Sequence, residues 1–223
     1  MSNFLSATLG RKVFMSLTGL FLISFLSIHL ILNLLLIFDD SGNLFNQAAH
    51  FMATNPIIKI VEPILALGFI IHIIWAVWIT LDNMKARPQK YESGDQLLKW
   101  WAPSKNMFII GGMIFIFLIL HLFNFWVKIK ITGDELLGTS EEMHNTYALV
   151  SNLFIHYPLY DFIYVLSGIF VGLHMSHGFW SAFQTIGLNN IKWMKRLKCL
   201  ANLIGFVFAI GFASIPIYFL IKF

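Results

Sequence analysis

Charged side chains are scarce in this sequence of 223 residues. Asp, Glu, Lys and Arg together make up 12% of it, about half of what a soluble domain normally carries. So few charges leave too little polar surface to cover a water-soluble globule, and a membrane protein is therefore the first interpretation. The net charge of +4 does not indicate a nucleic-acid partner, because the basic residues stand between apolar blocks and not on one face of a domain.

Cysteine is nearly absent as well, since Cys199 is the only one. A single thiol forms no internal disulfide and cannot hold an iron–sulfur cluster. The lack of a Cys-x-x-Cys-His sequence also excludes covalently attached c-type haem. Any redox centre in this chain must therefore use other ligands.

Apolar residues, in contrast, make up 58% of the chain. They are gathered in blocks of about twenty, the length of a helix that crosses roughly 30 Å of hydrocarbon. The pattern predicts an all-α membrane protein with a single domain over residues 1–223 and no soluble catalytic domain. The five predicted transmembrane helices lie at about residues 13–38, 57–81, 107–127, 159–183 and 200–221.

Lysine and arginine are divided unevenly between the two sides of this arrangement. Eleven lie on the side of the N-terminus and four on the other side. The positive-inside rule therefore predicts a cytoplasmic N-terminus in a multi-pass protein of the cytoplasmic membrane. On the outer side, Leu44–Met52 predicts a short interfacial helix, and residues 128–158 are expected to form a loop.

Four histidines lie deep in the first four predicted spans, one in each: His29, His72, His121 and His174. Ionisable residues inside a membrane are costly and usually face the bundle interior for a functional reason. A structural hydrogen bond between helices explains one such histidine equally well. It explains four of them, in four different helices, much less well.

Depth sorts these histidines into two layers. Each follows the start of its span by about fourteen or fifteen residues, roughly 21 Å at 1.5 Å per residue. Because successive spans run in opposite directions, the pair His29/His121 is expected near the outer surface and the pair His72/His174 near the cytoplasm. Two imidazoles from facing helices can bind a haem iron on both sides, which suits electron transfer. We therefore expect four of the helices to form a bundle around two b-type haems.

Neighbouring residues leave alternatives open. Zinc fits less well, because a structural zinc needs four converging ligands, usually with cysteine among them. His177 lies one helical turn after His174 and could replace it as a ligand. Gly19 and Gly111 each precede a histidine by ten residues, which places them at the cytoplasmic layer, where they would leave room for a flat macrocycle. Helix packing explains these glycines, and also Gly68, Gly168 and Gly172, equally well.

Three stretches resemble a known family, the diheme cytochrome b subunit that anchors succinate dehydrogenase and fumarate reductase with five helices. They are Ser16–Leu22 followed by His29 and Asn33, then Phe45–Met52, and then His174–Ser181. The resemblance extends over nearly the whole chain. It implies that His29, His72, His121 and His174 are the axial iron ligands, with His174 favoured over His177. Ser16 and Thr18 fall where the family contacts haem groups near the cytoplasmic side.

The function implied by this resemblance is that of an electron-transfer subunit of a succinate:quinone oxidoreductase, with no dicarboxylate site of its own. Its partners would be a flavoprotein subunit and an iron–sulfur subunit on the cytoplasmic face, membrane lipid, and a quinone, with menaquinone favoured. Quinone is bound near the outer haem in this family. The candidate quinone residues are His50, at the position of an acidic residue in one branch, and Glu62 near the start of the second span.

Two other functions stay open at this point. One is a diheme anchor of a different respiratory enzyme, such as a formate dehydrogenase or a hydrogenase. The other is a haem-free transporter or proton channel that uses its histidines directly, although transporters often show broken helices and repeats that are not evident here. A reduced-minus-oxidised spectrum with b-type bands separates the haem protein from the transporter.

Overall fold

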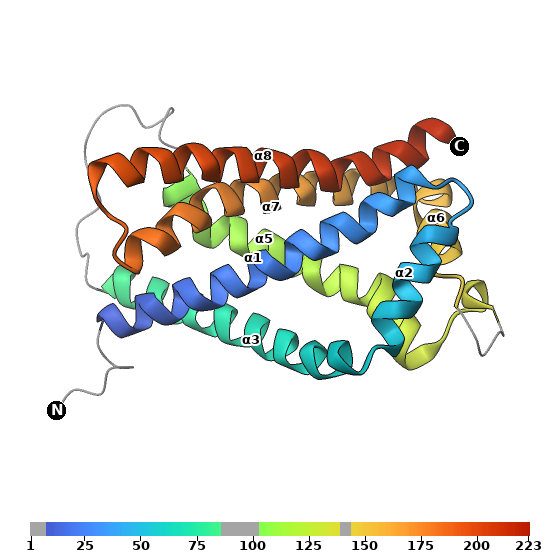
Figure 1. Ribbon diagram of the computed structural model, residues 1–223, viewed down its shortest axis with the longest axis horizontal. Helices are drawn as coiled ribbons and strands as arrows, with labels where there is room; N and C mark the ends of the chain where they lie inside the picture. The colour runs from blue at the N-terminus through green and yellow to red at the C-terminus, as the bar shows by residue number, and fades with distance from the viewer. Residues whose placement is uncertain (1–7, 86–102, 139–143) are drawn as a thin grey trace.

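The computed structural model describes residues 8–85, 103–138 and 144–223, and within these ranges the chain is helical without any strand. Its long helices run side by side (Figure 1) and are α1 (Thr8–Phe38), α3 (Pro56–Lys85), α5 (Pro103–His121), α7 (Pro158–Thr185) and α8 (Ile191–Lys222). α5 continues as two π-helical segments, η1 (Leu122–Trp126) and η2 (Lys128–Thr132).

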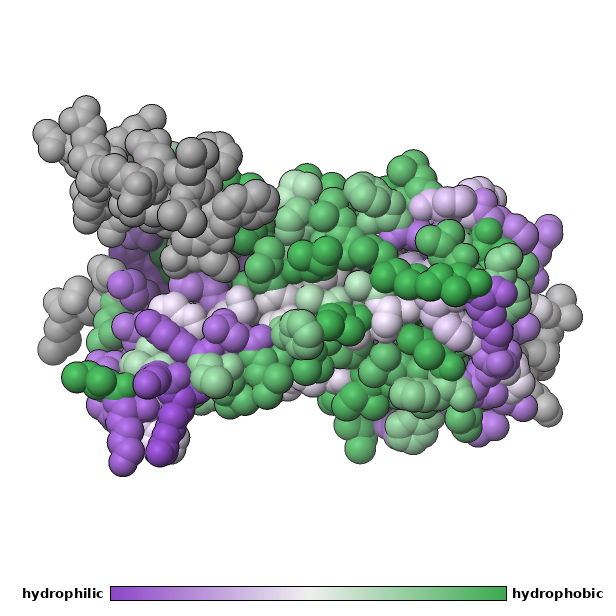
Figure 2. Space-filling view, turned by 90° about the horizontal axis from the view of Figure 1, so that it is seen from above, coloured by the Kyte–Doolittle hydropathy of each residue, from purple (hydrophilic) through white to green (hydrophobic). Residues whose placement is uncertain are grey.

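Five helices in the described part of the chain are long and apolar enough to cross a membrane: Leu9–Phe38, Pro56–Lys85, Asn106–Thr132, Pro158–Thr185 and Ile191–Lys222. This confirms the five predicted spans. A helix is the natural form of such segments, because it satisfies every backbone hydrogen bond internally in the absence of water. Figure 2 shows the result on the surface, an apolar band between two polar ends.

The helices are longer than the apolar blocks that predicted them. α8 begins at Ile191, where the Asn190 side chain accepts a hydrogen bond from the Trp193 amide at 3.0 Å. The helical backbone hydrogen bonds continue through turns with charged residues, and these turns lie outside the apolar block from which the span was predicted. α7 likewise begins at Pro158, whose missing N–H costs nothing in the first turn of a helix.

The end of the molecule opposite the N-terminus carries shorter elements (Figure 1). One is α2 (Asn43–Thr54), which confirms the helix predicted over Leu44–Met52. Another is α6 (Thr146–His156), in the region 128–158 that we expected to be a loop, so that prediction is wrong. Asn145 caps α6, and an apolar face with Leu149, Val150 and Phe154 is buried against its neighbours.

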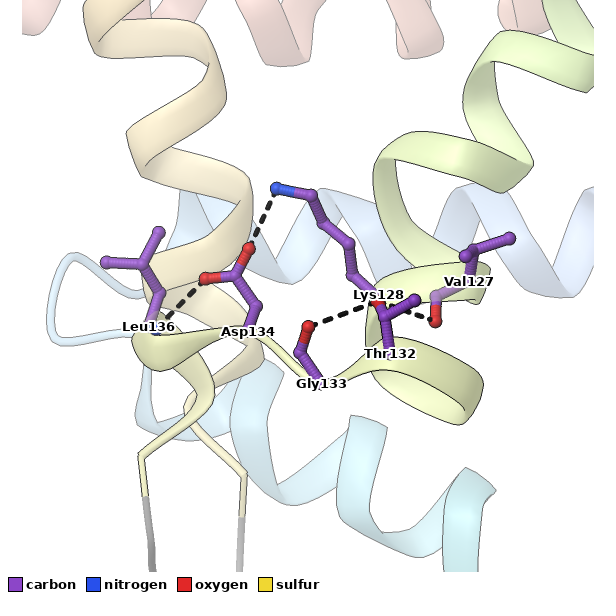
Figure 3. Close-up of polar contacts among 6 residues, drawn as sticks. All are labelled: Val127, Lys128, Thr132, Gly133, Asp134 and Leu136. Carbon is purple, nitrogen blue, oxygen red and sulfur yellow. Dashed lines mark hydrogen bonds and ion pairs between the residues drawn. The ribbon is translucent and has the colours of Figure 1, made fainter.

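The third span also extends further than predicted, so Lys128 and Lys130 are helical and not part of a loop. Figure 3 shows how this extension ends: the Lys128 Nζ atom donates to the Asp134 carboxylate at 2.8 Å, and Asp134 accepts a second bond from the Leu136 amide at 3.0 Å. The Lys128 ammonium and this amide lower the pKa of Asp134 below its usual value. Asp134 thereby connects η2 to the 3-10 turn η3 (Glu135–Leu137).

Packing is closest between α7 and α8. A Cβ added to Gly172 would stand 2.4 Å from the carbonyl oxygen of Gly205, so the two backbones touch where both residues lack a side chain. α3 and α5 are packed less tightly, since α3 buries only Gly68, and α5 buries only Ile110 among residues 106–121. The fold thus combines the close helix pair α7/α8 with the two looser helices α3 and α5.

Candidate functional site

The histidines of the first four spans lie on α1, α3, α5 and α7 and form two pairs. The ring centres of His29 and His121 are 5.8 Å apart, with planes at 88°. The ring centres of His72 and His174 are 6.3 Å apart, with planes at 71°. The structure therefore brings together the two pairs expected from depth, while their role as iron ligands stays a prediction.

These separations suit a shared metal ion. A metal–imidazole bond of about 2.0–2.1 Å, with about 1.1 Å more from the nitrogen to the ring centre, separates two rings on opposite sides of one ion by about 6.2–6.4 Å. The observed 5.8 and 6.3 Å lie at or near that value. Steep angles between the ring planes are compatible with this arrangement, because each imidazole can turn about its own bond to the metal.

Two glycines leave space beside the His72/His174 pair. A Cβ on Gly19 would lie 3.7 Å from Cε1 of His72, and a Cβ on Gly111 would lie 3.6 Å from Cε1 of His174. Both glycines are at the layer predicted for them, and neither places a side chain against the Cε1 edge of these imidazoles. A flat macrocycle between the two rings would use this bare backbone.

The other glycines considered in the sequence serve helix packing. A Cβ on Gly68 would be 2.9 Å from the Phe21 ring, one on Gly168 would be 3.2 Å from the backbone of Ala213, and Gly172 meets Gly205 as described above. For these three, the close-packing explanation accounts for the structure.

Thr18 determines the hydrogen-bonding state of His72. Its hydroxyl oxygen lies 3.0 and 3.1 Å from the carbonyl oxygens of Phe14 and Met15, so its proton is donated within α1. The same oxygen lies 3.2 Å from Nδ1 of His72 and is left to accept. His72 then carries its proton on Nδ1, which leaves Nε2 with the free electron pair that a metal ligand needs.

His121 has a different set of neighbours. The Tyr164 hydroxyl lies 3.5 Å from Nδ1 of His121 and accepts a bond from the Asn124 side chain at 3.0 Å. Asn124 belongs to the π-helical segment η1, a type of distortion that is frequent at functional sites. The sequence analysis missed Tyr164 and Asn124. The available signal was a polar residue three positions after His121 in an otherwise apolar span.

The remaining ligand candidates have mainly apolar surroundings. The His29 ring stacks on Phe25 at 5.4 Å and lies 6.1 Å from Phe212, and its backbone carbonyl accepts a bond from Asn33 at 2.8 Å. Nδ1 of His174 is buried and has no hydrogen-bond partner among the described residues.

His177 does not share the His72 site. Its ring packs edge-on against Trp180 at 4.9 Å, and Lys198 lies over the same indole at 4.8 Å. His174, one turn earlier, is the residue that lies beside His72. The geometry therefore favours His174 over His177 as the partner.

No group of three His, Cys, Asp or Glu side chains in the described ranges is arranged to hold a metal ion. Each histidine pair supplies only two donors. A haem brings four nitrogen donors of its own and needs two more from the protein, so the residues present fit this group.

The two quinone candidates lie apart from the histidine pairs. His50 is on α2 and exposed, and its side chain has no hydrogen bond to another described residue. Glu62 accepts a bond from the Trp126 indole at 2.8 Å and pairs with Lys130 at 3.1 Å. Glu62 therefore connects α3 to the π-helical extension that follows His121.

No family model, curated protein or solved structure matches this chain. Its class is therefore defined by its own fold, which is that of a multi-pass helical membrane protein with two internal histidine pairs.

Proposed function

We propose that this chain is a diheme cytochrome b, the membrane-anchor subunit of a succinate:quinone oxidoreductase. One observation supports this proposal more than any other: two pairs of histidines from four helices stand at the separation expected for imidazoles on opposite sides of one iron. The resemblance of the stretches around His29, His50 and His174 to the family supplies the identity of the enzyme.

The residues of the chain have distinct tasks in this function. His72 and His174 would hold one haem b, and His29 and His121 would hold the other; a bound haem would supply an iron that gains and loses one electron. Thr18 orients His72, and the glycines Gly19 and Gly111 allow close approach of the backbone.

The two layers suggest the order of the proposed transfer. Electrons would pass between an iron–sulfur subunit on the cytoplasmic face, itself served by a flavoprotein subunit, and the His72/His174 layer. The His29/His121 layer would exchange them with a quinone, with menaquinone as the favoured substrate. Basic residues at the start of α8 form a surface suited to an acidic partner: Lys192, Lys195, Arg196 and Lys198.

Removal of single ligands tests this function. His72→Ala and His174→Ala are each expected to remove the same haem and to leave the other in place, measured by pyridine haemochrome content and potentiometric titration of the purified complex. His177→Ala is the matched control one turn away and keeps both haems. A wild-type protein without b-type bands would favour the haem-free transporter and reject the proposal.

The quinone site is tested with His50→Ala and Glu62→Gln in the assembled complex. We propose His50 as the proton partner of the quinone headgroup, because it is exposed and an imidazole ring can both donate and accept a hydrogen bond. His50→Ala should lower succinate-to-quinone activity and leave succinate-to-dye activity unchanged. Normal quinone activity in His50→Ala with a loss in Glu62→Gln moves the assignment to the carboxylate.

A further inference from the structure

Asp161 is a carboxylate that the proposed function does not use. It lies in the first turn of α7 and is 3% exposed. Both of its carboxyl oxygens are enclosed and have no hydrogen-bond partner among the described residues. Among the other described carboxylates, Glu135 is exposed, and the remaining five have hydrogen-bond or ion-pair partners: Asp39, Asp40, Glu62, Asp82 and Asp134.

The surroundings of Asp161 follow from the helix it belongs to. Gly168 and Gly172, seven and eleven residues later, lie about two and three turns further along the same face, and both pack against α8. Because α7 and α8 are antiparallel (Figure 1), this seam continues toward the last turns of α8, where Pro216 and Phe219 are fully buried. Lys222 at the end of α8 is paired with Asp40.

One neighbour connects Asp161 to the histidines. Tyr164 is three residues later, a spacing that makes two side chains neighbours on a helix. The Tyr164 hydroxyl in turn contacts His121 and Asn124. Asp161 thus lies one turn beyond the His29/His121 layer, toward the end of the bundle that holds α2 and α6.

Enclosure of both oxygens without a hydrogen-bond partner disfavours the ionised form of a carboxyl group. We propose that Asp161 is a proton-binding site: a carboxyl group that is protonated in the folded protein and exchanges its proton with water at this end of the bundle. In the exchange, the O–H bond breaks, the proton passes to water and a carboxylate remains until a proton returns. The role of this site rests on the proposed function: it supplies protons for quinone reduction, which takes up two electrons and two protons.

Infrared spectroscopy of the full-length protein in membranes tests the site without reference to haem or quinone. The carbonyl stretch of a protonated carboxyl group should be present in the wild type, shift to lower frequency in deuterium oxide, and disappear in Asp161→Asn. Asp161→Glu should keep such a band, which shows that its loss in Asp161→Asn is not a loss of fold. Asp134→Asn, at a half-buried carboxylate that is paired with Lys128, is the matched control and leaves the band unchanged.

The absence of this band from the wild type overturns the proposal, because the carboxylate is then ionised. A band that deuterium oxide does not shift overturns it as well, because the proton is then sequestered. In the assembled complex, Asp161→Asn should lower quinone activity at least tenfold at normal haem content and dye activity, with recovery in Asp161→Glu. Unchanged quinone activity overturns the role in proton supply, whereas a protein without haem rejects the proposed function and leaves the infrared result intact.

Discussion

Hydrogen bonding differs between the two imidazoles of the His72/His174 pair. Nδ1 of His72 has the Thr18 hydroxyl as its acceptor at 3.2 Å, whereas Nδ1 of His174 has no partner among the described residues. A hydrogen bond to the outer nitrogen fixes the orientation of a ligating histidine and makes it more basic. If the pair holds a haem as proposed, Thr18 is expected to tune it through His72.

Replacement of Thr18 by valine tests this role, because valine keeps the shape and removes the acceptor. We expect Thr18→Val to weaken haem binding at this pair by about 10–100-fold, the usual effect of losing such an outer partner. In the fraction of protein that still binds haem at this pair, we also expect a higher midpoint potential of that haem, because a less basic ligand stabilises the oxidised iron less. Thr18→Ser keeps the hydroxyl and should behave as the wild type. An unchanged potential in Thr18→Val would show that the contact has no influence on the haem.

Short elements determine the shape of the end of the bundle that holds α2 and α6. Asn46 on α2 donates to the Asn145 side chain at 3.0 Å and accepts from the Tyr147 amide at 2.8 Å, which joins α2 to the start of α6. Asp39 before α2 accepts from the Leu44 amide at 2.8 Å, and this bond lowers the pKa of Asp39. The turn between α1 and α2 is thus held by side chains on both sides of Gly42.

Gly42 is required at this turn for two reasons. Its φ is 72°, and a Cβ would stand 2.3 Å from Cγ of Tyr147. The left-handed conformation costs another residue about 1–2 kcal/mol, and the contact with Tyr147 adds to that. Gly42→Ala should therefore lower the thermal inactivation temperature of the purified protein. The control is the same change made beside Tyr147→Ala, which removes the ring that the new Cβ would meet; an equal loss with and without the ring would exclude a contribution from Tyr147.

The Asp134–Lys128 pair at the end of the third span gives a pH dependence. Because the pKa of Asp134 is lowered in the folded protein, its contribution to stability is present above the unfolded value of about 3.9. It is lost as the pH falls through the lower folded value, so the effect is confined to the acid range. Proteolysis between residues 128 and 146 should accelerate below about pH 4 in the wild type. In Asp134→Asn it should be faster already at neutral pH, and equal rates there would contradict a role for the pair.

The whole molecule has the surface of a membrane protein, with an apolar band that separates two polar ends (Figure 2). Its five spans place the two termini on opposite sides. The uneven division of lysine and arginine predicts that the N-terminal side is cytoplasmic. Part of this count falls on Arg87, Lys90 and Lys99, which lie outside the described residues.

Reporter fusions check this orientation. Alkaline phosphatase is active only outside the cytoplasm, so a fusion after Phe223 should be active and a fusion after Lys85, at the end of α3, should be inactive. The opposite pair of results would invert the molecule. The His72/His174 layer would then be the outer one, and the partner subunits would have to dock at the other end.

Much of this architecture was predictable from sequence, because it depends on distance along single helices. Each residue adds 1.5 Å of rise, so the spans, the two histidine layers and the levels of Gly19 and Gly111 follow from residue counts and alternating direction. Span ends and the helix α6 were not predictable in this way. Charged turns continue a helix without an apolar signal, and α6 has its apolar face covered only after distant segments have packed around it.

Direction around each helix axis was decided by tertiary structure alone. A sequence gives the depth of His72, but packing of α1 against α3 brings Thr18 to its Nδ1 atom. It places His121 in the third span, but packing against α7 supplies Tyr164. Asp161 reads as a residue near the end of a span, and only the seam between α7 and α8 makes it a buried carboxyl group. Rise is a property of one chain segment, whereas burial and contact depend on which neighbours are packed around it.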